Sequence, residues 1–301
     1  MNTPLRIGTR ASKLARIQTD IFVRKLKEVY PSLQDDKLII NPQETSGDKH
    51  ASERLADIGG KGLFTKELDG SLLKGDIDIA VYSLKDVETI LPEGIEIACV
   101  LERGDPRDVF ISKAGLSLKD LPKNSVIGTA SLRRQAQILE YRPDLRINLM
   151  RGNVPTRLRK LITEGFDGTL LALAGLERLG LETGITEILD PSFFVPAAGQ
   201  GAIVACIKKD RQDIKDLLAP LNHEETFLCI AAERSLLKAL DATCRTPVGS
   251  YAIKTKEGLV LKGFLGVEDG SKGVRHEAQG SDPIMLGLEV ADCLKRFMDK
   301  E

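Results

Sequence analysis

The chain has 301 residues, of which 42% are hydrophobic and 29% are charged, and its formal net charge is −1. This length allows two or three domains with sizeable cores, and the balanced charge argues against a protein that mainly coats nucleic acid or a membrane. The apolar runs are too short to span a bilayer, and the first residues contain no signal-peptide core. We therefore expect a soluble, cytoplasmic protein.

The first two thirds of the chain alternate short strand-like runs with longer helical ones, which is typical of a parallel α/β sheet. The first half of this region predicts strands and helices at residues 5–9, 12–29, 38–41, 62–75 and 77–83. Ser12 is a candidate cap for the first helix. The apolar stripe of that helix consists of Leu14, Ile17, Ile21, Phe22, Leu26 and Val29.

A second α/β unit is predicted from about residue 105, with the same repeat of strand, turn and helix. Its strands and helices are expected at residues 125–129, 130–142, 146–152, 153–165 and 168–175. A strand at 201–207 could return the chain to the first unit. The remainder predicts a helix at 223–240, capped by Asn222, and then three β-rich runs and a helix at 283–298. This order favours a small α+β third domain.

Five cysteines are scattered along the chain, with neither C-x-x-C nor His/Cys ligand spacing. Disulfides and structural zinc are therefore not expected. Four of the cysteines lie among apolar residues, as small buried hydrophobes do. Cys244 lies instead in the turn DATCRTPVGS beside an arginine, and this context leaves both an incidental and a functional thiol open.

Polar residues follow several predicted strands, where ligands of α/β sheets bind. Residues 129–160 contain eight basic side chains against two acidic ones. Because the arginine fork binds carboxylates in a bidentate manner, this cluster indicates a ligand with several carboxylates or phosphates. At the strand–helix junctions we expect binding by Arg133, Arg134, Arg151 and Arg157. On the helix surfaces we expect solvated side chains at Arg142, Arg146, Arg159 and Lys160.

Asp86 follows the predicted strand at 77–83. A helix cap, a salt-bridge partner and a general acid or base all remain open for this carboxylate.

Nine motifs point to a known family. They are RIGTRASKLA, GGKGLFTKEL, YSLKDV, GTASLRRQ, RGNVPTRLRKL, LALAGLERLGL, PAAGQGA, the run from ER to Cys244, and TPVGSY. In this order they make the chain resemble the hydroxymethylbilane synthase (porphobilinogen deaminase) family over nearly its whole length. The resemblance implies two α/β lobes like those of type II periplasmic binding proteins, with the active site in the cleft between them, and a small α+β domain. The expected boundaries are 1–101 with 199–221, 102–198, and 222–301.

The resemblance also implies an activity in haem biosynthesis. Four porphobilinogen molecules are joined head to tail, with release of ammonia, on a dipyrromethane cofactor bonded to Cys244, and hydrolysis frees the linear tetrapyrrole hydroxymethylbilane. Asp86 matches the catalytic carboxylate. The matches to cofactor contacts are Lys85, Thr129, Ser131, Arg133, Arg134 and Arg157. The matches to substrate contacts are Arg10, Ser12, Lys61, Phe64, Arg151, Arg178 and Gln200. We expect a monomer with no metal, nucleic acid or membrane partner.

The chain departs from the family pattern at Tyr82, Glu88, Ala242 and Thr243, where His, Pro and two small residues, often glycines, are common. If a glycine at that position normally has a positive φ, Thr243 would be strained or the loop rearranged. A mobile lid is expected around residues 46–60. The alternatives are an anion-binding module that lost catalysis and a nucleic-acid binder, against which the lack of tryptophan and the 4% aromatic content count.

Overall fold

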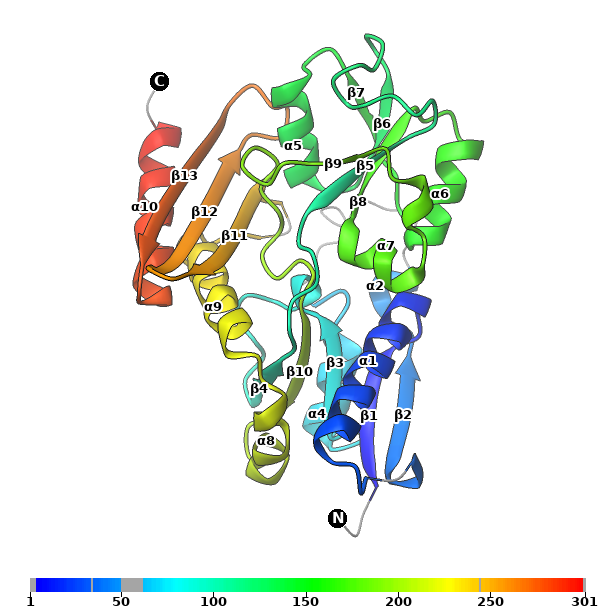
Figure 1. The fold of residues 1–301 in the computed structure, drawn as a ribbon, viewed down its shortest axis with the longest axis vertical. Coiled ribbons are helices and arrows are strands. Elements are labelled where there is room, and N and C mark those ends of the chain that lie inside the picture. The colour runs from blue at the N-terminus through cyan, green and yellow to red at the C-terminus, as the bar shows by residue number, and fades with distance from the viewer. Residues whose placement is uncertain (1–3, 34, 50–61, 244, 300–301) are drawn as a thin grey trace. The chain divides into compact units, whose positions relative to one another are not determined.

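The computed structural model describes residues 4–33, 35–49, 62–243 and 245–299 (Figure 1). The chain forms two units. Among the described residues, the first unit contains those up to 49, 62–104 and 201–227, and the second contains 105–200 and 228–299. Each unit is therefore built from segments that are not continuous in sequence.

The first unit contains a five-stranded sheet in the order β2-β1-β3-β10-β4. Its strands are β1 (Leu5–Arg10), β2 (Leu38–Gln43), β3 (Ile79–Ser83), β4 (Ile95–Val100) and β10 (Ile203–Lys208). Strand β1 is parallel to β2 and β3, whereas β10 is antiparallel to both β3 and β4. The predicted parallel pairing is therefore found between β1, β2 and β3, while β10 is antiparallel because it enters from a distant part of the chain and not through a βαβ crossover.

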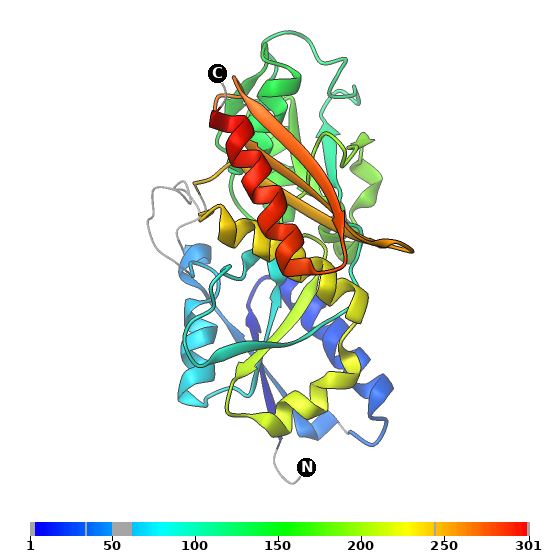
Figure 2. The same cartoon turned by 90° about the vertical axis from the view of Figure 1, so that its left-hand side faces the viewer.

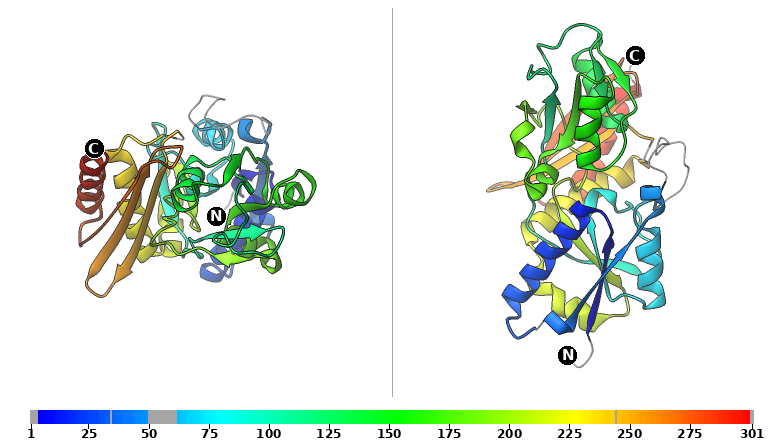
Figure 3. Two further views of the ribbon diagram at one scale, coloured as in Figure 1. Left: turned by 90° about the horizontal axis from the view of Figure 1, so that it is seen from above. Right: turned by 90° about the vertical axis from the view of Figure 1, so that its right-hand side faces the viewer.

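Helices cover both faces of this sheet (Figure 3). One face packs on α1 (Lys13–Val29) and α8 (Gln212–Leu218), and the other on α4 (Lys66–Lys74). The Ser12 side chain accepts a hydrogen bond from the Ala15 amide, which confirms it as the cap of α1. Of the predicted apolar stripe, Phe22 and Leu26 are fully buried but Val29 is exposed. The short elements are η1 (Asp35–Lys37), α2 (Ser46–Lys49), η2 (Leu84–Asp86) and η4 (Ala219–Leu221).

The second unit contains a second five-stranded sheet, in the order β7-β6-β8-β5-β9. Its strands are β5 (Asp108–Ser112), β6 (Val126–Gly128), β7 (Arg146–Asn148), β8 (Gly168–Ala172) and β9 (Glu187–Ile188). Strand β5 is antiparallel to β8 and β9, so it occupies the place that β10 occupies in the first sheet. The two sheets share one strand order, and the expected pair of type II α/β lobes is confirmed.

The helices of this lobe also lie on both faces of the sheet. One face packs on α5 (Leu132–Tyr141), and the other on α6 (Val154–Thr163) and α7 (Leu173–Leu179). A short 3-10 helix, η3 (Glu182–Gly184), follows α7. The predicted strand at 168–175 is too long, because β8 ends at Ala172 and the next residues form α7, which Gly180 ends with a φ of 67°.

The second unit also contains a three-stranded antiparallel sheet of β11 (Val248–Thr255), β12 (Gly258–Gly266) and β13 (Gly273–Gly280). It packs on α9 (Glu224–Ala239) and α10 (Pro283–Asp299), and Figure 2 shows α10 lying along the sheet. The α+β third domain is therefore confirmed. The predicted cap of α9 is wrong: Asn222 accepts a hydrogen bond from the Val100 amide, and His223 Nδ1 accepts one from the Thr226 amide.

The described cysteines form no disulfides with one another. Cys99, Cys206 and Cys229 are buried and Cys293 is half-buried. In the described parts of the chain, no cluster of His, Cys, Asp and Glu could hold a metal ion. No helix in those parts is long and apolar enough to cross a membrane.

Candidate active site

In the first unit, one 3-10 turn places Lys85 and Asp86 at the carboxyl end of β3. Within this turn Leu84 is buried, and its amide donates to the Ala202 carbonyl over 3.0 Å. Val87 is buried as well, whereas Lys85 is exposed and Asp86 keeps 25% of its side chain exposed. The alternation of buried and exposed positions therefore turns both polar side chains away from the core.

Asp86 forms an ion pair with Arg10, the last residue of β1. Arg10 Nη1 lies 3.2 Å from Asp86 Oδ2, and the Arg10 side chain is 17% exposed. The same guanidinium lies 4.3 Å from the centre of the Phe64 ring, which is a favourable cation–π position. The structure thus brings together Arg10, Phe64 and Asp86, three of the predicted site residues. Ser12, a fourth, caps the helix that follows β1.

A buried pair lies on the strand that leads to Asp86. The Tyr82 hydroxyl donates to Asp69 Oδ1 over 2.7 Å, and both side chains are buried. Burial raises the pKa of Asp69, against the hydrogen bonds from Tyr82 and Thr65. Burial, and next the charge of Asp69, raises the pKa of Tyr82 well above its usual value. Tyr82, where the family commonly has His, is therefore a hydrogen-bond donor to a core carboxyl group.

In the second unit, Thr129 and Ser131 form the turn between β6 and α5. The Ser131 side chain caps α5 by accepting from the Arg134 amide, and Thr129 Oγ1 accepts from the Ser131 amide over 3.1 Å. Arg133 and Arg134 are the second and third residues of this helix, and they are only 5% and 6% exposed. Two cations of the predicted binding set are therefore buried.

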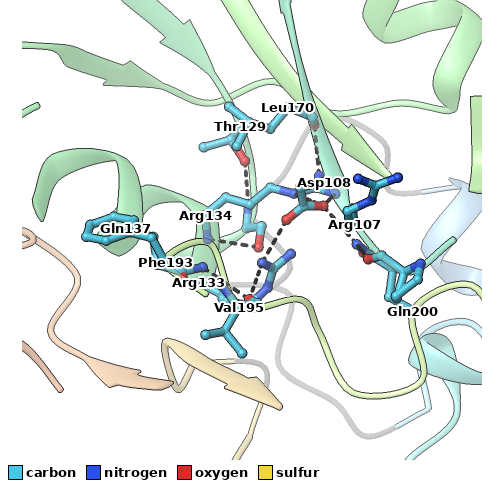
Figure 4. Close-up of polar contacts among 12 residues, drawn as sticks. Arg107, Asp108, Thr129, Arg133, Arg134, Gln137, Leu170, Phe193, Val195 and Gln200 are labelled. Atoms are coloured by element: carbon cyan, nitrogen blue, oxygen red, sulfur yellow. Dashed lines mark hydrogen bonds and ion pairs between the residues drawn. The ribbon is translucent and has the colours of Figure 1, made fainter. Parts of the chain in front are cut away.

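Asp108 is the carboxylate that pairs with both arginines (Figure 4). It is 1% exposed; Arg133 Nη1 lies 2.8 Å from its Oδ2, and Arg134 Nη2 lies 2.7 Å from its Oδ1. Gln200 Nε2 donates to Oδ1 over 2.9 Å and also to the Pro106 carbonyl. Burial alone would raise the pKa of Asp108, but the charges and hydrogen bonds of Arg133 and Arg134 outweigh it and hold this pKa well below its usual range.

The sequence analysis missed Asp108 because it lies at the beginning of a strand. Strand β5 is antiparallel, with Asp108 opposite Ala172 at the end of β8, so its first residue reaches the edge where the parallel strands end. Asp108 could have been found only by predicting that β5 is antiparallel. The alternation of strand-like and helical runs in the sequence does not indicate the direction of a strand.

The other predicted arginines of this unit stand on separate elements. Arg151 follows β7 and is 6% exposed, Arg157 lies in α6, and Arg178 lies near the end of α7, where burial lowers its pKa. Arg157 Nε donates to the Gly152 carbonyl over 2.7 Å. Gly152 has a φ of 119°, and a Cβ atom there would lie 2.6 Å from Thr156 Cγ2, so this turn requires glycine.

The interpretation of Arg142 as a solvated side chain is wrong. Its guanidinium pairs with Asp144 and donates to the carbonyls of Leu118, Lys119 and Leu121. Arg146 and Arg159 are exposed, as expected, and Lys160 pairs with Glu164 on the surface of α6.

Two predicted site residues, Cys244 and Lys61, lie outside the described residues, as do residues 50–60 of the predicted lid. On either side of position 244, Thr243 and Arg245 are exposed. The Thr243 carbonyl accepts from the Thr246 amide, and the Thr243 amide donates to Thr246 Oγ1 over 3.1 Å. Among the described residues other than glycine, positive φ occurs at Asn124 and Asp241 alone, so Thr243 does not carry the strain of a positive φ.

Comparison with known proteins gives consistent matches. Residues 5–216 match the family model "Porphobilinogen deaminase, dipyromethane cofactor binding domain", and residues 227–296 match "Porphobilinogen deaminase, C-terminal domain". The porphobilinogen deaminase of Desulfitobacterium hafniense is 46% identical over 96% of this chain and 93% of that protein. The one from Staphylococcus carnosus is 44% identical over 98% of this chain and 96% of that protein.

A solved structure with some likeness is a TRAP periplasmic solute binding protein from Desulfovibrio salexigens. It is 11% identical, with a TM-score of 0.46, over 75% of this chain and 74% of that chain.

Proposed function

Because the chain belongs to the porphobilinogen deaminase family, we propose residue roles for the reaction of that family. The enzyme is a transferase of tetrapyrrole biosynthesis that condenses porphobilinogen, with release of ammonia, on a dipyrromethane cofactor and yields hydroxymethylbilane. The observation that carries the roles is the pairing of carboxylates with arginines at the carboxyl ends of the strands in each unit.

Asp86 is the proposed catalytic carboxylate. When porphobilinogen loses ammonia, its ring becomes a cation, and a fixed carboxylate stabilises that charge and can take up or return the protons of the reaction. The ion pair with Arg10 and the contact of Arg10 with Phe64 restrict the rotation of Asp86. The group is about three quarters buried, so water screens its charge less than at the surface.

The residues around Asp108 fit an acidic cofactor. Two guanidinium groups share one carboxylate, and Arg133 Nε is buried without a hydrogen-bond partner among the described residues. A carboxylate of dipyrromethane would supply the missing charge and acceptor. When bound, this group supplies the pyrrole carbon that attacks the substrate. We assign its covalent attachment to Cys244 and its binding to Lys85, Thr129, Ser131, Arg133, Arg134 and Arg157.

Substrate binding is assigned to the remaining set: Arg10, Ser12, Lys61, Phe64, Arg151, Arg178 and Gln200. The proposed domain boundaries are 1–101 with 199–221, 102–198, and 222–301, and the three separate sheets and cores support three domains. We also propose a cytoplasmic monomer that acts without nucleic acid, in keeping with the balanced charge.

The test is the intact mass of the purified chain and of two cysteine variants. The wild-type chain should carry the mass of a dipyrromethane, give a colour reaction with an aldehyde reagent for pyrroles, and release ammonia from porphobilinogen. Cys244→Ser should lack the added mass because its hydroxyl is a much weaker nucleophile than the thiol. Cys293→Ser, which removes a half-buried thiol, is the control and should keep it. A Cys244→Ser chain that still carries the pyrrole would show that another residue is the attachment site.

A further inference from the structure

The group around Asp108 has one positive charge in excess. Asp108, Arg133 and Arg134 are each at least nine-tenths buried, and arginine stays protonated in proteins. Both Asp108 oxygens are used inside the protein: Oδ1 accepts from Arg134 and Gln200, and Oδ2 accepts from Arg133. Asp108 is therefore not placed to contact a substrate itself.

The two arginines are not equivalent. Arg134 donates from Nε and Nη2 to Asp108 and from Nη1 to the Leu170 carbonyl. Within the described part of the chain, Arg133 donates from Nη1 alone, to Asp108 and to the Val195 carbonyl. Its Nε is buried without a partner among the described residues. The Nε–Nη2 edge, with which arginine binds a carboxylate in a bidentate manner, therefore remains for a ligand.

We propose that Asp108 is a positioning residue: it holds Arg133 by Nη1 so that the Nε–Nη2 edge is fixed for one carboxylate of the cofactor. The inference rests on the proposed cofactor-binding role of Arg133. Arg134 and Gln200 support Asp108 from its other oxygen. In this arrangement Asp108 balances one of the two arginine charges, and the ligand carboxylate balances the other.

A thermodynamic cycle tests this inference with the full chain. The unfolding temperature is measured for the wild type, Cys244→Ser, Asp108→Asn and the double variant. In the wild type the bound cofactor should raise the unfolding temperature above that of Cys244→Ser, because a ligand held by the folded state stabilises it. If Asp108 positions Arg133, this difference should shrink by about half or more in the Asp108→Asn background, because the two sites are coupled. An unchanged difference would overturn the proposal.

Asp78→Asn is the matched control. Asp78 is 7% exposed and also pairs with two arginines, Arg6 and Arg211, but it lies before the amino end of β3. Asp78→Asn should lower the unfolding temperature. The difference in unfolding temperature between chains with Cys244 and chains with Cys244→Ser should stay the same as in the wild-type background. If Asp108→Asn does not fold, Asp108→Glu repeats the cycle, because it keeps the charge and displaces the carboxylate.

The outcome also separates this inference from the proposed function. If the wild type and Cys244→Ser carry the same added mass, the attachment site at Cys244 is wrong. If the wild type alone carries the cofactor and Asp108→Asn behaves like Asp78→Asn, only the role of Asp108 is wrong.

Discussion

Two carboxylates of the first unit differ in what surrounds them. Asp86 is partly exposed and is held by the cation of Arg10, whereas Asp69 is buried and is held by the neutral hydroxyl of Tyr82. The Arg10 cation attracts the Asp86 carboxylate, whereas burial disfavours the charged form of Asp69. The first environment suits electrostatic stabilisation of a substrate cation, and the second affects the stability of the fold.

Asp86→Asn should lower kcat by about a hundredfold, because an amide cannot balance a developing cation or exchange protons at that point. Folding and the mass of the attached cofactor should stay the same. The measurement is ammonia release per cofactor-bearing chain. Asp213→Asn, which removes an exposed carboxylate paired with Arg211, is the control with unchanged kcat. A kcat of Asp86→Asn close to the wild type would exclude the catalytic role.

Tyr82→Phe should reduce the free energy of unfolding by about 2 kcal/mol near neutral pH, because it removes one of the hydroxyl donors to a buried carboxylate. The pKa of Asp69 is raised in the folded state, and the Tyr82 hydrogen bond opposes that rise. Without the hydroxyl this pKa rises further. In the unfolded state the pKa of Asp69 is the ordinary 3.8. The folded variant therefore binds more protons than the unfolded variant over a wider pH range than in the wild type. The effect of Tyr82→Phe should therefore grow as pH rises above that value.

Urea unfolding at acidic and neutral pH measures this difference. Tyr30→Phe is the control, because the Tyr30 hydroxyl donates to the uncharged Leu217 carbonyl, and its effect should not depend on pH. An equal effect of Tyr82→Phe at both pH values would contradict the role of Asp69.

At the scale of elements, an arginine of the three-stranded sheet is paired with a carboxylate of α5. Arg275 of β13 donates from Nη1 and Nη2 to the Glu140 carboxylate of α5, each over 2.8 Å. Its guanidinium also lies 4.0 Å from the centre of the Phe193 ring and 4.7 Å from that of Phe264. Since α5 carries Arg133 and Arg134, this contact fixes the helix of the binding arginines on the C-terminal sheet.

Arg275→Lys should destabilise the chain by about 2 kcal/mol, because lysine cannot make the bidentate pair or stack its head group on two rings. A double-mutant cycle with Glu140→Gln should show a favourable coupling energy between the two positions. Arg296→Lys, on the exposed surface of α10 where Arg296 pairs with Asp292, should have little effect. Urea unfolding measures all four variants, and additive effects at positions 140 and 275 would show that the pair contributes nothing.

Local patterns predicted most elements, but not the order of the strands. Turn and cap signals placed β1, α5, α6 and the three C-terminal strands close to their observed positions. Periodicity does not encode direction, so the antiparallel β5 and β10 could not be predicted from it. Asp108 was missed for that reason. Arg133 and Arg134 were identified, yet their burial and their shared carboxylate depend on a strand that precedes them by more than twenty residues.

At the scale of the whole molecule, the described residues of each unit include a buried carboxylate that pairs with two arginines. The pKa of Asp78 is lowered because Arg6 and Arg211 outweigh its burial, and the pKa of Asp108 is lowered in the same way by Arg133 and Arg134. For such carboxylates, the contribution of the ion pairs to folding stability is complete above the unfolded-state pKa of 3.8. It is lost as pH falls toward the lower folded-state pKa. Acid should therefore weaken both units over the same range.

In the wild type the free energy of unfolding should fall steeply as pH decreases below the unfolded-state pKa of 3.8. The fall should be less steep in Asp78→Asn, which has no carboxylate to protonate at that position. Urea titrations at a series of pH values give this slope. Equal slopes in the two proteins would mean that other carboxylates dominate acid unfolding.

The inserted strand β10 has a consequence for the order in which a ribosome makes the protein. Strand β10 lies between β3 and β4, yet β4 ends at Val100 and β10 begins at Ile203. Until the later segment emerges, the nascent chain holds two strands with open edges and no strand to join them, a state that invites chaperone binding or aggregation. Translation must therefore pass through the entire second α/β lobe before the sheet bearing Asp86 can close.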